Sequence, residues 1–166
     1  LALATDIADA DFLLAIHPGL LGSFERLEKD SPEKYMRVRR FFTEWERLPN
    51  TGVLWHGGYM TVMKASDLFI TDGVSLLAEY QFVNKPILFI EREGHAAFNS
   101  LGKKMSAGWN TIASTDMDTL REMVLYFKAG GIDGHAKAQI ENVTSLTQHR
   151  NAAENILRTI KQDVGR

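Results

Sequence analysis

Residues 65–89 read ASDLFITDGVSLLAEYQFVNKPILF, and this stretch decides the fold that the sequence predicts. The segment Asp67–Asp72 is typical of a central strand, because apolar residues dominate it and a turn at Gly73 follows. Apolar residues then recur at helical spacing across Val74–Asn84, and Lys85–Ile90 has the length and composition of a second strand. The order strand, helix, strand predicts a parallel pair of strands joined by a helix.

The same alternation extends along the rest of the chain. Further strands are expected at Phe12–His17, Val53–Trp55 and Thr111–Ala113. Further helices are expected at Ser31–Leu48, Tyr59–Ser66, Ala96–Met105, Asp116–Lys128 and Asp133–Lys161, the last broken near Gln148–Asn151. This pattern predicts the α/β class, with a parallel sheet covered by helices on both faces. Because the sequence shows no linker or repeat, we expect residues 1–166 to form a single domain.

The composition of the 166-residue chain is globular, since 45% of the residues are apolar and 24% are charged. Nineteen basic against 21 acidic residues give a formal charge of −2, whereas nucleic-acid-binding domains normally carry a positive surplus. The absence of cysteine excludes disulfides, thiolate zinc sites and cysteine nucleophiles. No apolar run approaches the ~20 residues of a membrane span. The start Leu-Ala-Leu-Ala has no basic segment before it, so we expect part of a longer protein rather than a signal peptide.

Three loops rich in small and polar residues follow expected strands. They are His17-Pro18-Gly19, His56-Gly57-Gly58 and the segment Thr71, Asp72, Gly73, Val74 and Ser75. In an open parallel sheet, ligands bind beyond the carboxyl ends of the strands. We therefore expect these loops to line a ligand site. The remaining histidines lack the spacing of metal ligands, so no metal is expected.

The segment Thr71–Ser75 has the most specific chemistry of the three. A strand end, a glycine turn and a helix start near Val74 would direct unbonded backbone N–H groups at a phosphate. Ser75 adds a hydroxyl, and Glu79 lies four residues further on, on the same predicted helix face. A carboxylate there could accept hydrogen bonds from the vicinal hydroxyls of a nucleotide. The alternative is structural: Asp72 caps the helix, and Ser75 and Glu79 are ordinary helix residues.

The stretch 65–80, followed by the segment 84–89, resembles the CDP-glycerol glycerophosphotransferase family of teichoic-acid polymerases and primases, where the phrase is roughly ADVLITDYSSLLFEY…KPILFF. Ile16-His17-Pro18 is similar to that family's His-Pro motif, and the segment 151–156 to its closing helix. The resemblance implies a Rossmann-like domain, the C-terminal donor-binding half of a GT-B fold. It also implies transfer of glycerol phosphate from CDP-glycerol to a cell-wall or surface polymer. An N-terminal domain would complete the site, so this chain alone should be inactive.

Residue by residue, the resemblance implies that His17 acts at the donor phosphates. Val74 and Ser75 fall on the family's Ser-Ser pair, which contacts the pyrophosphate, and Glu79 falls on the acidic position that binds the ribose. Gly73 stands where the family has tyrosine, and Val74 where it has the first serine. A related GT-B glycosyltransferase that uses another nucleotide-activated donor is therefore an alternative.

Two interpretations of a different class remain. One is a flavodoxin-like phosphoryl receiver with Asp72 as the acceptor, although receivers need an acidic pair after the first strand to hold Mg²⁺ and this chain has His17-Pro18-Gly19 there. The other is a domain that only docks proteins.

The resemblance itself implies a cytoplasmic enzyme, or one peripheral at the inner face of the membrane, whose partners are a nucleotide-activated donor and a polymer or lipid-linked acceptor. It implies no cofactor and no nucleic acid.

Overall fold

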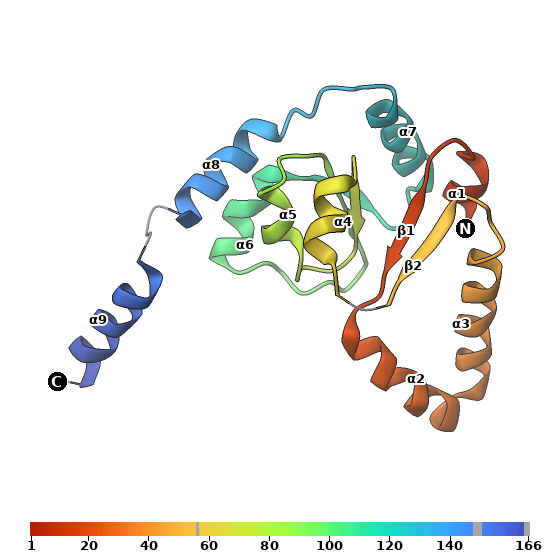
Figure 1. Ribbon diagram of the computed structural model, residues 1–166, viewed down its shortest axis with the longest axis horizontal. Helices are drawn as coiled ribbons and strands as arrows, with labels where there is room; N and C mark the ends of the chain where they lie inside the picture. The colour runs from red at the N-terminus through yellow and green to blue at the C-terminus, as the bar shows by residue number, and fades with distance from the viewer. Residues whose placement is uncertain (56, 148–150, 165–166) are drawn as a thin grey trace. The chain divides into compact units, whose positions relative to one another are not determined.

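The computed structural model describes residues 1–55, 57–147 and 151–164 (Figure 1). The chain consists of two compact parts, unit 1 (Leu1–Ala65) and unit 2 (Ser66–Arg166). Both units contain parallel strands that alternate with helices, so the expected α/β class is confirmed.

The bounds of the elements agree with most of the sequence-based expectations. Unit 1 contains α1 (Ala2–Asp6), β1 (Phe12–Ala15), α2 (Pro18–Asp30), α3 (Pro32–Trp45), β2 (Thr51–Leu54) and α4 (Tyr59–Ala65). Unit 2 contains β3 (Phe69–Thr71), α5 (Leu77–Gln81), β4 (Ile87–Glu91), α6 (Ser100–Met105), the 3-10 turn η1 (Ser106–Gly108), β5 (Asn110–Ala113), α7 (Met117–Lys128), α8 (Ala136–Thr147) and α9 (Ala152–Val164). The expected helix Asp116–Lys128 is confirmed, and Asp116 is its N-cap: the carboxylate accepts a hydrogen bond from the backbone N–H of Thr119, which lowers the pKa of Asp116.

Strands β1 and β2 of unit 1 lie side by side and run parallel, with residues 12–15 opposite residues 51–54 (Figure 1). Asn50, whose side chain is buried, directly precedes β2. Its Nδ2 donates to the main-chain oxygens of Ala4, Ile7 and Ala10, at 2.9, 3.2 and 2.9 Å. A buried amide with several partners holds the chain before β1 against the start of β2.

Helix α2 is a correction to the sequence-based prediction, which treated His17-Pro18-Gly19 as a loop and expected no helix between this loop and Ser31. Proline is favoured at the first position of a helix, because its φ is already helical and its missing N–H needs no partner there. Pro18 therefore begins a helix of 13 residues. Phe24 of α2 packs edge-to-face on Phe42 of α3, with ring centroids 5.8 Å apart, and Phe42 lies 5.3 Å from the ring of Trp55. These ring contacts join α2 and α3 to the end of β2.

Strand β4 is the centre of the sheet in unit 2, which has the order β3-β4-β5 with all strands parallel. Residues 87–89 are completely buried, as is typical of a parallel strand covered on both faces. Phe69 of β3 stacks on Tyr80 of α5 with ring centroids 4.7 Å apart. Burial raises the pKa of the Tyr80 hydroxyl, although a hydrogen bond with Ser66 Oγ at 3.0 Å opposes the change. The phenol is therefore neutral at physiological pH.

Helix α8 is attached to the rest of its unit through buried amide side chains. Gln139 Nε2 donates to the main-chain oxygens of Lys85 at 3.1 Å and Gly108 at 2.9 Å. Asn142 Nδ2 donates to Gln81 Oε1 at 2.8 Å. Because a buried polar group without a partner costs free energy, this amide network specifies where α8 packs against α5 and η1.

The pairing of the strands differs from the expectation of one sheet. The described strands form two hydrogen-bonded sheets, β1-β2 and β3-β4-β5. An apolar pattern indicates that a segment is a strand, but it does not specify the partner, which lies far away in the sequence. That residues 1–166 form a single domain stays a prediction. Within the described ranges, no helix has the length and apolar character needed to cross a membrane.

We expect Gly108→Ala to lower the melting temperature by about 3–10 °C. A Cβ at Gly108 would stand 2.5 Å from Gln81 Oε1 and 3.2 Å from Asn142 Nδ2, so the buried amide pair would have to move. Overpacking of this kind typically costs about 1–3 kcal/mol. The matched control is Gly134→Ala, because a Cβ at Gly134 meets nothing within 4 Å. Equal melting temperatures for the two variants, measured by circular dichroism, would contradict the role of this network.

Candidate functional site

The turn that follows β3 in unit 2 is closed by the side chain of Thr71, the last residue of that strand. Thr71 Oγ1 accepts a hydrogen bond from the N–H of Gly73 at 3.0 Å and donates to the carbonyl of Gly73 at 3.2 Å. Among the hydrogen bonds of the described residues, none is donated by the N–H groups of Val74 and Ser75, and both residues are exposed. Consecutive backbone N–H groups without internal partners are what a phosphate binds.

Helix α5 begins later than the sequence predicts. Its first residue is Leu77 and its N-cap is Leu76, whose side chain makes no capping hydrogen bond. Ser75 therefore belongs to the turn, and it does not share a helix face with Glu79, which is exposed in the first turn of α5. Asp72 does not cap the helix either. The predicted helix start at Val74 is wrong because the Thr71 side chain closes a separate turn before the helix begins.

Gly73 does not have the conformation that would require glycine. Its φ lies outside the left-handed region, in contrast to Gly57 and Gly58, whose φ values are +56° and +70°. A Cβ at Gly73 would lie 3.7 Å from Thr71 Oγ1, which is ordinary contact. The turn therefore does not depend on glycine at this position.

Asp72 makes an ion pair that the sequence analysis missed. Its Oδ2 lies 3.2 Å from Nε of Arg92, the first residue after β4. Since β3 and β4 are parallel neighbours, their carboxyl ends bring the two side chains to one edge of the sheet. The signal was present in the sequence, because Arg92 lies two residues after the expected strand Lys85–Ile90, but no role is predicted for the end of that strand.

In unit 1, His17 has a structural role at the end of β1. It is the N-cap of α2, and its Nδ1 accepts a hydrogen bond from the N–H of Gly19 at 3.1 Å. The residue before it, Ile16, accepts a hydrogen bond from the hydroxyl of Tyr59 in α4 at 3.0 Å. The exposed His17 ring therefore lies at the carboxyl edge of the β1-β2 sheet.

The loop after β2 belongs to the same edge. Gly57 and Gly58 have left-handed φ values, which explains glycine at both positions. The carbonyl of Gly58 accepts hydrogen bonds from the N–H groups of Thr61 and Val62 and so begins α4. His56 lies outside the described residues. Because β1 and β2 are parallel neighbours and Tyr59 bonds to Ile16, unit 1 brings its two predicted loops together.

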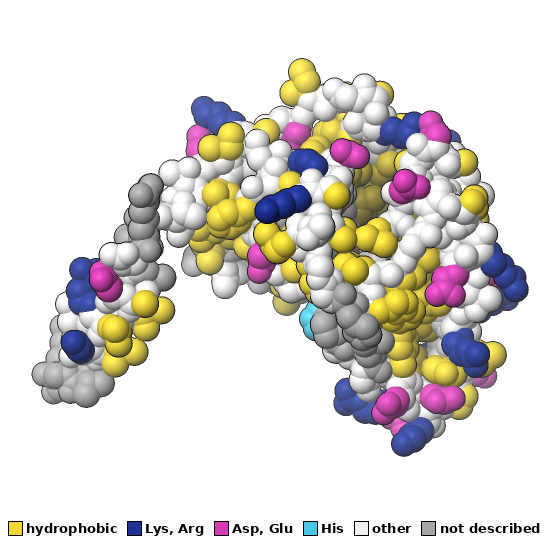
Figure 2. All heavy atoms as spheres, in the orientation of Figure 1, with side chains coloured by type: hydrophobic (Ala, Val, Ile, Leu, Met, Phe, Trp, Pro, Cys, Tyr) yellow, Lys and Arg dark blue, Asp and Glu magenta, His cyan; other side chains and the backbone are white. Residues whose placement is uncertain are grey.

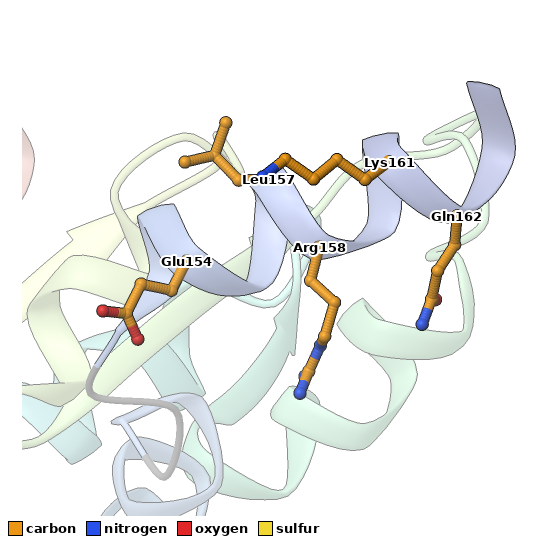
Figure 3. Close-up of a pocket in the computed structure, with 5 residues that line it drawn as sticks. All are labelled: Glu154, Leu157, Arg158, Lys161 and Gln162. Atoms are coloured by element: carbon orange, nitrogen blue, oxygen red, sulfur yellow. The ribbon is translucent and has the colours of Figure 1, made fainter. Parts of the chain in front are cut away.

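Two further observations concern metal binding and helix α9. No group of three or more His, Asp or Glu side chains among them could hold a metal ion. A hollow beside α9 is lined by residues of that one helix, so it is an open groove and not a cavity (Figure 3). The lining residues are Glu154, Leu157, Arg158, Lys161 and Gln162. Figure 2 shows the apolar side chains of α9 gathered on one face of that helix, and Ile156, Leu157 and Ile160 are exposed.

Comparison with models of known protein families and a search of curated proteins found no match. The resemblance of residues 65–89 to the glycerophosphotransferase family therefore stays an interpretation of the sequence. A function for this chain rests on the chemistry of the two strand edges.

We expect His17→Ala to lower the free energy of unfolding by about 0.5–2 kcal/mol, the range for loss of a helix N-cap. The variant removes the acceptor of the Gly19 N–H bond at the start of α2. His17→Asn restores an acceptor and should unfold close to the unmodified chain in urea. Equal destabilisation by alanine and asparagine would show that ring packing, and not capping, is what His17 contributes.

Proposed function

We propose that this chain is the donor-nucleotide-binding domain of a GT-B transferase, which moves glycerol phosphate from CDP-glycerol to a cell-surface polymer. The observation that carries the proposal is the exposed turn after β3, where the N–H groups of Val74 and Ser75 have no described partner. That turn lies at the carboxyl end of a parallel sheet whose central strand is buried at residues 87–89, and this end is the usual ligand edge of such sheets.

The strand pairs of both units support a Rossmann-like fold. Parallel β1 and β2 are neighbours, and β4 lies between β3 and β5. A doubly wound sheet contains these neighbours, and its strands are followed by helices as β1, β2 and β3 are here. The resemblance of residues 65–89 to the donor-binding half of a GT-B enzyme supports the finer assignment.

In the proposed site, the turn of unit 2 holds the diphosphate. The N–H groups of Val74 and Ser75 and the Ser75 hydroxyl donate to phosphate oxygens. Val74 lacks the hydroxyl of the serine that the family has at this position, but its backbone N–H is still a donor. Glu79 is exposed in α5 and accepts hydrogen bonds from the ribose hydroxyls. Asp72 belongs to the proposed site through its ion pair with Arg92.

In unit 1, the resemblance gives His17 a role toward the donor phosphates, in addition to its capping bond. Because Nδ1 accepts from Gly19, the neutral ring carries its proton on Nε2. Nε2–H can therefore donate a hydrogen bond to a phosphate oxygen and stabilise the negative charge on the leaving nucleotide. Gly57 and Gly58, at the same strand edge, allow a ligand to approach the backbone closely.

Titration calorimetry of the chain with CDP, UDP, pyrophosphate and cytidine tests the proposal. We expect CDP to bind more tightly than pyrophosphate or cytidine, because the site has donors for the phosphates and an acceptor for the ribose. Tighter binding of UDP than of CDP would indicate the alternative, a glycosyltransferase that uses another nucleotide-activated donor. Absence of binding by all four compounds would contradict the proposed function.

We expect Glu79→Ala to weaken CDP binding about ten- to a hundredfold and to leave pyrophosphate binding unchanged. The reason is the loss of charge-assisted hydrogen bonds to the ribose, worth roughly 1.5–3 kcal/mol. Glu122→Ala is the matched control, because Glu122 is an exposed glutamate of helix α7 in the same unit. An equal loss of CDP and pyrophosphate affinity in Glu79→Ala would show that the carboxylate does not recognise the ribose.

A further inference from the structure

Arg92 is the residue at the proposed phosphate site that neither the sequence motif nor the resemblance assigns. It directly follows β4, the central strand of its sheet, whose residues 87–89 are completely buried. The register pairs Thr71 of β3 with Phe89 of β4, so both strands end at the same edge. The turn that contains Val74 and Ser75 follows β3 at that edge. Arg92 is therefore placed beside the turn by the sheet itself.

The ion pair between Arg92 and Asp72 can be exchanged for another partner. Arg92 Nε lies 3.2 Å from Asp72 Oδ2, and the two side chains are 59% and 58% exposed. Exposed ion pairs contribute at most about a factor of five to an equilibrium. A guanidinium has five N–H donors in a planar fork, and the contact to Asp72 is made by Nε. A ligand that offers more negative charge and more acceptors should displace the carboxylate.

We propose that Arg92 binds the phosphate groups of a nucleoside diphosphate, and that Asp72 holds the guanidinium at the edge while the site is empty. The inference rests on the proposed function and names a binding residue for it. A diphosphate presents several oxygens to the fork and can be bound bidentately, which is the recognition for which arginine is suited. Asp72 then acts as a stand-in for the ligand.

The charges around Arg92 make its role decisive for anion binding. Glu91 and Glu93 precede and follow it, and both are exposed. With Asp72, these carboxylates would repel a diphosphate from this edge. Arg92 offsets that repulsion, so removal of its charge should affect anion binding more than removal of a cation elsewhere on unit 2.

The test uses Arg92→Gln and Asp72→Asn, titrated with CDP and with pyrophosphate in the presence of EDTA. EDTA ensures that binding through a metal ion held by the carboxylates is not measured. We expect Arg92→Gln to weaken binding of both compounds about tenfold or more. We expect Asp72→Asn to strengthen both about two- to fivefold, because the guanidinium no longer has to leave a carboxylate.

The matched controls come from the ion pair of Lys137 and Glu141 on α8, which are 3.9 Å apart and exposed. Lys137→Gln and Glu141→Gln break that pair and change the net charge by the same amounts as the two test variants. We expect neither control to change affinity by more than about twofold, since charges far from a ligand are screened by salt.

The outcomes distinguish the failure of this inference from the failure of the proposed function. If CDP binds and Arg92→Gln binds it equally well, Arg92 is not a phosphate ligand, and the proposed function stands. Weaker binding by Asp72→Asn would overturn the stand-in role and show that Asp72 positions the guanidinium for the ligand. If neither CDP, UDP nor pyrophosphate binds the unmodified chain, both proposals are wrong.

Discussion

The burial of β4 on both faces is the constraint on which the rest of unit 2 depends. Residues 87–89 have no exposed surface, and the strand pairs on one side with β3 and on the other with β5. Parallel pairing aligns the carboxyl ends of the strands at one edge. Asp72 and Arg92, far apart in the sequence, therefore form an ion pair at that edge. Strand β4 contributes no side chain to the proposed phosphate binding, but its position in the sheet brings the residues of the candidate site together.

The layer behind the sheet is held by polar contacts as well as by apolar packing. Asn142 of α8 donates to the buried side chain of Gln81. Gln139 donates to the main-chain oxygens of Lys85, which precedes β4, and of Gly108, the last residue of η1. A purely apolar interface would allow α8 to slide, because apolar packing is not directional. Buried amides require particular partners, so they specify one position of the helix. The glycine at position 108 is part of this arrangement, since it leaves room for the amide of Gln81.

The two strand edges carry their polar groups in different ways. In unit 1, His17 is fixed as the N-cap of a helix of 13 residues, and its position is set by main-chain geometry. In unit 2, Arg92 is held by an exposed carboxylate, and its position can change when a better partner arrives. The fixed ring of His17 suits a hydrogen bond of constant geometry, whereas the Arg92 guanidinium, whose partner can be exchanged, suits the binding of an anion.

The sequence by itself determined the α/β class, the order of the strands, and the helices α3, α4 and α7, because these depend on apolar periodicity and local caps, but it did not indicate α2. It placed His17, Asp72 and Ser75 at strand ends for the same reason. The start of α5, the pairing of strands in two sheets and the Asp72–Arg92 contact were decided only by the tertiary structure. Each of these depends on which distant residues become neighbours, or on a side chain competing for a backbone N–H as Thr71 does at Gly73. Periodicity in one segment carries no information about such partners.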